Sequence, residues 1–196
     1  MSPRSFLSRF AVPLLGVGTV AVIAATVRRP RAQAPHHSNR PVCAADNGGL
    51  TLPSGLCALV VAKDIGPVRQ LVVASNGDVF ANAEGRRLIA LRDTSGDGVA
   101  DIVRRFGSSG GTGIALHDHH LYYSTDDAVY RYPLKDGQLE PTDPPETVVA
   151  GLPNGGNHTS KTITIDADGN LFVNIGSASN SCQERNRASR SPGRNP

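Results

Sequence analysis

Three stretches of the chain repeat one pattern, in which an apolar run, a short polar turn and a second apolar run follow one another. They span residues 69–82, 112–125 and 161–177. Asn-Gly and Asp-Gly, the dipeptides that favour tight β-hairpins, form the first and third turns, whereas the second turn is less ideal. When the turns are aligned, Gly77, His119 and Gly169 fall in register at spacings of 42 and 50 residues. The pattern therefore predicts three related β-hairpins.

The spacing of these hairpins constrains the fold class. A unit of 40–50 residues made of several short antiparallel strands is the period of a β-propeller blade, and further strands are expected at residues 86–93 and 128–134. Propellers close with about 4–8 blades, whereas this chain holds two to three such units. We therefore expect an all-β fold, an incomplete β-propeller of about two to three blades. A small β-sandwich with similar hairpins is the alternative.

Composition agrees with an all-β chain and argues against one class of partner. The 196 residues include 21 Gly and 14 Pro, as expected where many turns join short strands. The net charge is only +3, and much of it comes from arginines near the two ends of the chain. No basic stripe with interleaved aromatic residues lies between them, so we expect no nucleic-acid partner.

The N-terminus has the features of an export signal. Arg4 and Arg9 precede an uncharged, mostly apolar run at residues 10–27, and an Ala-x-Ala cleavage pattern ends at Ala34. Residues 1–34 are therefore predicted to be either a cleaved signal peptide or a retained N-terminal membrane anchor. Residues 35–41 would be a linker, and residues 42–196 the partial propeller. We expect a periplasmic or other extracytoplasmic location, free or anchored to the plasma membrane; a cytoplasmic protein with a buried N-terminal helix is the alternative.

The cysteines agree with export. Cys43 and Cys57 bracket a stretch rich in turn residues, which can close on itself. In an oxidising compartment we expect a disulfide between them, worth about 3 kcal/mol for a ring of this size in the chain-entropy model. The alternative is two unpaired small core residues. Cys182 is left over, and an odd cysteine in an exported protein suggests a missing partner.

A short acidic stretch resembles part of a calcium-binding loop. Positions 1, 3, 5 and 9 of the pattern are Asp93, Ser95, Asp97 and Asp101. Gly98 supplies the turn at position 6, but Arg104 stands at position 12, where a calcium loop of the EF-hand type has a bidentate glutamate. The pattern predicts either a weak structural calcium site or a plain hairpin that connects two strands.

Two groups of histidines are candidates for chemistry. His117, His119 and His120 suggest metal ligation, but strand alternation would send His117 and His119 to one face and His120 to the other, so a polar turn is favoured. His158 lies in a loop that leads into a strand. A neutral imidazole there could take a proton from a substrate hydroxyl, or it could be an ordinary loop residue.

The order and spacing of several stretches resemble one family of enzymes. These are CAADNGGLTLPSGLCA, LVVASNGDVF, ALRDTSGDGVADIVRRFG, GGTGIALHDHHLYYSTDDAVYRYPL and ETVVAGLPNGGNHTSKTITIDADGNLFVNIGSASNSCQ. Together, over about residues 42–196, they are similar to the sorbosone dehydrogenase branch of the PQQ-dependent glucose/sorbosone dehydrogenases. That resemblance implies a six-bladed propeller that binds pyrroloquinoline quinone and oxidises a sugar or sugar aldehyde. A histidine base would take the hydroxyl proton, hydride would pass to the quinone, and an electron acceptor would reoxidise it.

The resemblance also implies roles for individual residues. His158 matches the family's base, in a Gly-x-His stretch that enters a strand. Asn157 stands where the glucose dehydrogenases have an acid, Lys161 stands at a basic position that could face the cofactor's carboxylates or cap the strand, and Ser109 lies in a stretch where related enzymes offer a glutamine to the cofactor. Asn157, Lys161 and Ser109 are therefore candidate cofactor-binding residues, with His158 the candidate catalytic residue.

Members of the resembled family continue for several more blades, which carry arginines for the cofactor and the ligands of its calcium ion. The resemblance therefore implies that this chain is the N-terminal portion of a longer enzyme, with the partner of Cys182 beyond Pro196. On that basis we expect a PQQ-dependent sugar dehydrogenase, truncated in this chain. The alternatives are a non-catalytic exported propeller fragment and a calcium-stabilised binding module.

Overall fold

The computed structural model describes residues 40–83, 87–181, 183–185 and 187–192. Within this part of the chain it contains ten β-strands, and the only helical element is a short 3-10 turn, η1 (Asn47–Gly49). The strands are β1 (Gln70–Val73), β2 (Val79–Asn82), β3 (Leu88–Arg92), β4 (Ile102–Phe106), β5 (Ile114–His117), β6 (His120–Ser124), β7 (Val129–Pro133), β8 (Glu146–Val149), β9 (Ile163–Ile165) and β10 (Leu171–Val173). The predicted all-β fold class is confirmed.

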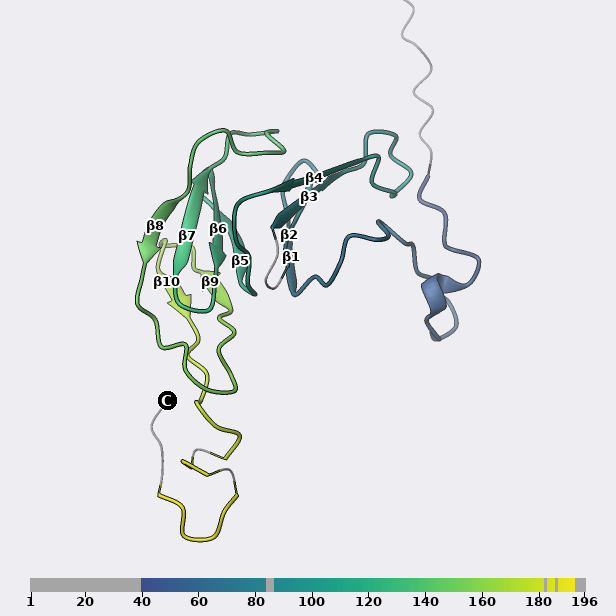
Figure 1. Cartoon of the computed structure of the whole chain (residues 1–196). Helices are drawn as coiled ribbons and strands as arrows, with labels where there is room; N and C mark the ends of the chain where they lie inside the picture. Colours follow the sequence, from purple (N-terminus) through teal and green to yellow (C-terminus); the bar gives the residue numbers. More distant parts are fainter. Residues whose placement is uncertain (1–39, 84–86, 182, 186, 193–196) are drawn as a thin grey trace, which may run out of the picture. The chain divides into compact units, whose positions relative to one another are not determined.

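The strands form two four-stranded sheets and one hairpin, as Figure 1 shows. The first sheet has the order β1-β2-β3-β4 and the second the order β5-β6-β7-β8, so that each strand pairs with its neighbour in sequence. All pairs are antiparallel, and β9 and β10 form the third unit. Two complete units and half of a third match the two to three repeats expected from the hairpin spacing. The strands expected at residues 86–93 and 128–134 are β3 and β7.

The three hairpin turns keep the register that the sequence pattern predicts. Gly77, His119 and Gly169 all have positive φ, at 91°, 56° and 84°. In the first and third hairpins the turn is closed by the same pair of backbone hydrogen bonds, for example from Ala74 N–H to Asp78 C=O. Glycine takes a positive φ without steric cost, which explains its place in two of the three turns.

The second turn is a two-residue connection, which makes the predicted arrangement of its histidines wrong. Asp118 and His119 both have positive φ, as a tight hairpin turn of this kind requires. His117 then pairs directly with His120 across β5 and β6, so these two side chains share a face. His119 lies at the tip, where its Nδ1 contacts Asp136 at 3.1 Å. Strand alternation failed as a guide because the chain reverses direction between His117 and His120.

Three apolar clusters form the core, two of them between successive units and one on the other face of the first sheet. One joins the first and second sheets through Phe80, Leu88 and Phe106 on one side and Tyr123 and Tyr132 on the other. The next joins the second sheet to the β9–β10 hairpin through Tyr122, Val129 and Ile163. The third lies on the opposite face of the first sheet, where Ala81, Ile89 and Leu91 pack against the extended stretch that precedes β1. The first and second sheets therefore each have an apolar cluster on both faces.

A buried polar network ties the same units together. Asn82, fully buried at the end of β2, donates from Nδ2 to the carbonyls of Gly113 (2.8 Å) and Ser124 (3.0 Å). Its Oδ1 accepts the N–H of Gly111 at 2.7 Å. Ser124, also fully buried, accepts the N–H of Gly113 and donates to the carbonyl of Lys161 at 2.6 Å. Because every one of these groups is buried, the bonds fix how each unit meets the next.

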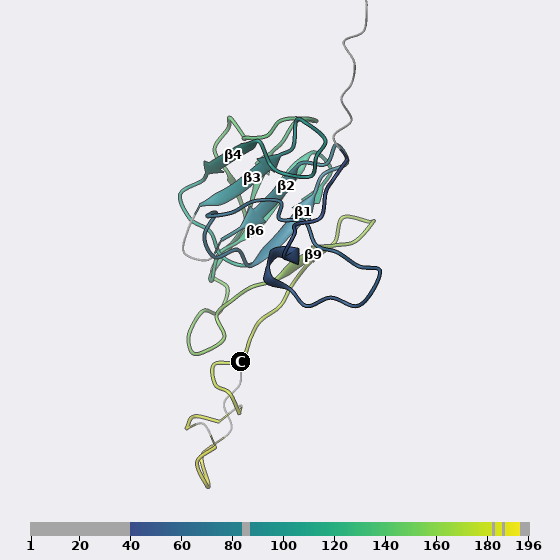
Figure 2. The same ribbon diagram turned by 90° about the vertical axis from the view of Figure 1, so that its right-hand side faces the viewer.

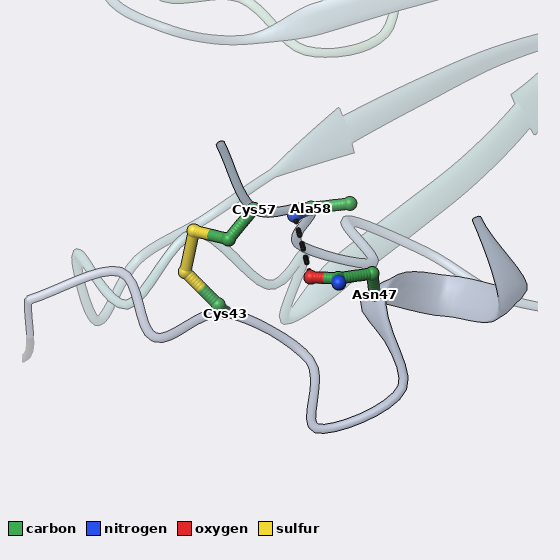
Figure 3. The surroundings of a disulfide bond; sticks show 4 residues. All are labelled: Cys43, Asn47, Cys57 and Ala58. Atoms are coloured by element: carbon green, nitrogen blue, oxygen red, sulfur yellow. Dashed lines mark hydrogen bonds between the residues drawn. A yellow bond between two sulfur atoms is a disulfide. The ribbon is translucent and has the colours of Figure 1, made fainter. Parts of the chain in front are cut away.

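The disulfide predicted between Cys43 and Cys57 is present, as Figure 3 shows. Inside the loop that it closes, the side-chain carbonyl of Asn47 accepts the N–H of Ala58 at 3.2 Å. The backbone of Ala44 also bonds to Ala58. The loop is thus held by the bridge and by hydrogen bonds, and it leads into the stretch before β1.

The predicted signal peptide or anchor at residues 1–34 lies outside the described residues. Among those that are described, no helix has the length and apolar character needed to cross a bilayer. Residues 40 and 41, the end of the predicted linker, are exposed and have no regular structure. Figure 2 shows β1–β4 side by side from a second direction.

Candidate functional site

The candidate base His158 lies in an irregular segment just before β9. This segment, residues 155–162, runs alongside the residues that follow β10, because Asn174 N–H donates to Thr162 C=O at 3.2 Å. Farther along, Asn157 N–H donates to Ala178 C=O at 3.1 Å. The β9–β10 hairpin therefore continues beyond its strands as two loosely paired segments, and His158 is on the first of them.

Two glycines allow these segments to approach closely. A Cβ atom on Gly156 would lie 2.2 Å from the carbonyl oxygen of Ala178, and Gly156 has a φ of 103°. A Cβ atom on Gly176 would lie 2.3 Å from the carbonyl oxygen of His158. Both distances are far below van der Waals contact, so a side chain at either position would push the segments apart. The glycines fix the position of the His158 backbone.

The imidazole of His158 is exposed and makes one defined contact. Its Nε2 lies 2.7 Å from Oδ1 of Asn180, on the segment after β10. An amide oxygen only accepts hydrogen bonds, so in a neutral imidazole this contact favours the tautomer with the proton on Nε2 and the lone pair on Nδ1. Asn180 thus orients the ring through Nε2, and Nδ1 is the nitrogen left to accept a proton. This is the arrangement that a general base requires.

Lys161, a candidate cofactor-binding residue, is completely buried. Its ammonium group donates to the carbonyl of Thr159, and its own carbonyl accepts the hydroxyl of Ser124. Lys161 therefore belongs to the polar network that joins the second sheet to β9, and its charge points inward. Asn157, in contrast, is exposed beside His158.

Ser109, the remaining cofactor candidate, lies in a different place. It is half-buried in the loop between β4 and β5 and hydrogen-bonds to the phenol of Tyr123. Burial raises the pKa of Tyr123 well above its ordinary value, the phenols of Tyr132 and Tyr130 raise it further, and the bond from Ser109 opposes them. Tyr123 stacks on both of these tyrosines, at ring-centroid distances of 5.5 and 5.3 Å. Ser109 therefore belongs to the junction between the first two sheets.

The candidate calcium loop connects β3 and β4 and satisfies its own carboxylates. Asp93 accepts the N–H groups of Ser95, Gly96 and Gly98, and the bond from Gly98 contributes most to lowering its pKa. Asp101 accepts both the hydroxyl and the N–H of Thr94, which lower its pKa as well.

The hairpin alternative accounts for this loop without an ion. The carboxylate of Asp97 accepts the N–H of Val99, so three of the four candidate ligands are acceptors within the turn. Over the described residues, no three His, Cys, Asp or Glu side chains converge as a metal site would require. Calcium binding by this loop stays a prediction.

The structure thus brings Asn157, His158 and Lys161 into one segment and places Ser109 and the acidic loop elsewhere. Asn180, which lies 22 residues after its partner His158, is a residue of the site that the sequence did not indicate. Gly156 and Gly176 could have pointed to it, because a glycine on each of two neighbouring segments indicates that their backbones lie in close contact.

Most of the chain matches the model of one protein family. Residues 50–194 match the TrAA12-like model, and this match covers most of the chain. The chain belongs to the TrAA12-like family. No curated protein matches it. The match does not single out the sorbosone dehydrogenase branch that the sequence resembles.

Solved structures similar to this TrAA12-like chain include the holo form of the PQQ domain of pyranose dehydrogenase from Coprinopsis cinerea. That domain has 19% sequence identity and a TM-score of 0.53, over 60% of this chain and 30% of that one. The calcium structure of the Trichoderma reesei family AA12 enzyme has 22% identity and a TM-score of 0.56, over 72% and 35% of the two chains. Its iodide structure has 21% identity and a TM-score of 0.56, over 76% and 37%. The chain thus spans about a third of the length of these structures, and the likeness shows the fold.

Proposed function

We propose that this chain carries the proton-abstracting part of a carbohydrate oxidoreductase, in which His158 is the general base. The observation that carries the proposal is the contact between His158 Nε2 and Asn180 Oδ1 on an exposed ring, which makes Nδ1 the nitrogen that would accept the proton. Membership of the TrAA12-like family supports this class of reaction, because its structural neighbours include a pyranose dehydrogenase domain and a carbohydrate-active enzyme.

In this proposal the substrate is a sugar or sugar aldehyde hydrate that presents a hydroxyl to Nδ1 of His158. The base takes the hydroxyl proton as the adjacent carbon is oxidised. Asn180 holds the ring so that Nδ1 faces outward, and the close packing at Gly156 and Gly176 limits movement of the backbone beneath it. Asn157, which is exposed next to the base, would contact the same substrate or the cofactor.

Pyrroloquinoline quinone is the proposed electron-accepting cofactor, by resemblance, and a separate electron acceptor would reoxidise it. The residues described fit this group only in part. PQQ carries three carboxylates, and Lys161, the basic residue of the segment, directs its ammonium group to Thr159 in the interior. Ser109 is bonded to Tyr123 in another junction. The described residues therefore account for only part of a PQQ site, and the chemistry derived for this chain is confined to the base.

The repeated four-stranded meander supports a propeller architecture for this function. Two such sheets and a third hairpin stack through apolar clusters, as the successive blades of a propeller do. We propose an incomplete propeller of two to three blades. The Cys43–Cys57 disulfide favours an oxidising, extracytoplasmic location, as the predicted export signal does.

The proposal is tested by the reduction of a redox dye by the full chain supplied with PQQ, Ca²⁺ and a panel of aldoses and sugar aldehydes. Replacing His158 by Ala should lower the rate by about 10²–10⁴-fold, the range expected for a positioned general base. The matched control is His119→Ala, which removes an exposed histidine at a hairpin tip and should leave the rate unchanged. A rate equal in the His158→Ala and wild-type proteins, or no sugar-dependent reduction, would overturn the assignment.

A further inference from the structure

The dipeptide Asn-Gly occurs three times in the chain, at Asn47, Asn76 and Asn154. It favours tight turns, and it is also the context in which an asparagine is chemically least stable, because glycine has no side chain to shield its backbone nitrogen. That nitrogen can attack the side-chain amide carbon of the asparagine before it. The three sites share this chemistry, so a difference in their reactivity must come from the structure around them.

The reaction needs only water as a co-reactant. First, the glycine nitrogen bonds to Cγ of the asparagine, the bond between Cγ and Nδ2 breaks, and Nδ2 leaves as ammonia with the proton of the glycine N–H. Water then adds to one of the two carbonyl carbons of the cyclic imide and breaks the bond from that carbon to nitrogen, which leaves aspartate or isoaspartate. Either product carries a new carboxylate, which is ionised at neutral pH.

At Asn76 both reacting groups are held by hydrogen bonds. Nδ2 of Asn76 donates to Oδ2 of Asp78 at 2.8 Å, and its Oδ1 accepts the N–H of Asp78 at 3.1 Å. The N–H of Gly77 donates to the carbonyl of Ala74 at 2.9 Å, within the turn between β1 and β2. Attack by the Gly77 nitrogen therefore requires these bonds to break.

At Asn47 the reacting groups are held as well. Oδ1 of Asn47 accepts the N–H of Ala58 at 3.2 Å, as Figure 3 shows, and the N–H of Gly48 donates to the carboxylate of Asp46 at 3.0 Å. The disulfide closes the loop around this pair. The same attack is therefore opposed here by two hydrogen bonds and a covalent constraint.

Asn154 lies in surroundings of a different kind. It is exposed together with Gly155, in the irregular stretch between β8 and β9. Among the residues that the structure describes, neither the amide group of Asn154 nor the N–H of Gly155 makes a hydrogen bond. A Cβ atom on Gly155 would meet no atom within 4 Å, so the space beside this glycine is open. No described contact has to break before the two groups approach each other.

We propose that Asn154 is a site of spontaneous deamidation, and that in the folded chain it converts to isoaspartate and aspartate far faster than Asn47 and Asn76 do. The hydrogen bonds at the two protected asparagines, and their absence over the described residues at Asn154, carry the inference. It concerns the covalent state of the chain and does not depend on the redox function.

The modified residue lies in the stretch that leads to His158. Isoaspartate carries the backbone through its side-chain carbon, so it adds one carbon to the main chain shortly before Gly156. A Cβ atom on Gly156 would lie 2.2 Å from the carbonyl oxygen of Ala178, and the N–H of Asn157 donates to the same carbonyl, so this segment has little room to absorb the change. Conversion should therefore shift the amide resonances of Gly156 and Asn157.

The test is peptide mapping of the full chain during storage at mildly alkaline pH, where loss of the glycine N–H proton is easier. Mass spectrometry locates the change from amide to carboxylate, and an isoaspartyl methyltransferase with a labelled methyl donor detects isoaspartate. Asn154 should convert about 30-fold faster than Asn47 or Asn76, because at least two hydrogen bonds must break first at each of these. In concentrated urea all three should convert at similar rates, because the dipeptide is the same.

Gly155→Ala is the matched variant. Its methyl group meets no atom within 4 Å, so the fold should be kept, but the methyl group shields the attacking nitrogen. Conversion of Asn154 should become slower in this variant, whereas conversion of Asn47 and Asn76 should not change. Equal rates at the three asparagines in the folded chain would overturn the proposal, and so would a folded chain in which urea accelerates all three by the same factor. Neither result bears on dye reduction by His158.

Discussion

The junction at Asn82 and the segment at His158 both hold parts of the chain together with side-chain hydrogen bonds, but they do so in opposite surroundings. Asn82 and Ser124 are fully buried; the side chain of Asn82 makes three bonds to the second unit, and the hydroxyl of Ser124 bonds to Gly113 in its own unit and to Lys161 in the third. His158 is exposed and has one such bond, to Asn180. The buried junction at Asn82 has a fixed geometry but is not accessible to a substrate. At His158, one ring nitrogen is oriented by Asn180 and the other can face a substrate, as a general base requires.

The largest effect should come from Asn82→Ala. It would leave the N–H of Gly111 and the carbonyls of Gly113 and Ser124 buried without their partner, at a cost of about 3 kcal/mol or more in the free energy of unfolding. Urea denaturation measures this loss. Asn174→Ala is the control, because Asn174 follows the turn residue Gly169 as Asn82 follows Gly77 but bonds only to the exposed Thr162, so the loss should be about 1 kcal/mol. Equal losses at the two positions would contradict the contrast between the buried and the exposed asparagine.

A smaller loss is expected from Gly176→Ala in the other region. The added methyl group would lie 2.3 Å from the carbonyl oxygen of His158, so the two segments must separate, at about 1–3 kcal/mol in unfolding free energy. The shift of the His158 backbone should also appear as changed amide chemical shifts from Asn157 to Thr159. Gly155→Ala is a suitable control, because a Cβ atom there meets no atom within 4 Å. Unchanged chemical shifts in Gly176→Ala would show that the segments are not closely packed.

The contrast also explains which features the sequence could predict. Turn dipeptides and alternating apolar residues identified the hairpins, and the Cys43–Cys57 bridge followed from its turn-rich loop, because these signals are local. The strand β8 follows the proline-rich residues 141–145 and has no clear alternation, so its existence depends on pairing with β7. The burial of Lys161 depends on the junction with the second sheet, where its backbone carbonyl accepts the hydroxyl of Ser124, 37 residues earlier. The residue type determines which reactions or bonds a side chain can take part in, but only the fold determines whether that side chain is buried or exposed.

The ion pair beside the first junction makes stability depend on pH. Arg92 bonds to both carboxylate oxygens of the buried Asp78, at 2.7 and 2.6 Å, and these bonds lower the pKa of Asp78. A carboxyl group with a lowered pKa contributes stability above its unfolded-state pKa of about 3.9 and loses that contribution as pH falls toward the folded-state value. The melting temperature should therefore fall below about pH 4.5, and it should fall less in Asp78→Asn, which has no such proton to take up. Parallel pH profiles of the two proteins would exclude this role for Asp78.

The smallest effect on stability, and the most specific one, is expected at Asn180. Replacing it by Ala removes the hydrogen bond to Nε2 of His158 on an exposed surface, so the unfolding free energy should change by less than about 0.5 kcal/mol. The imidazole ring should nevertheless gain motion, which is measured as a lower order parameter from relaxation of its carbon nuclei. Asn180→Asp keeps an oxygen acceptor and should retain the order of the His158 ring. Asn154→Ala, which lies before His158 in the loop that leads to β9, should leave the order of the ring unchanged. If Ala at position 180 leaves the ring as ordered as in the wild type, Asn180 does not position His158, and the base would have to be oriented by its backbone alone.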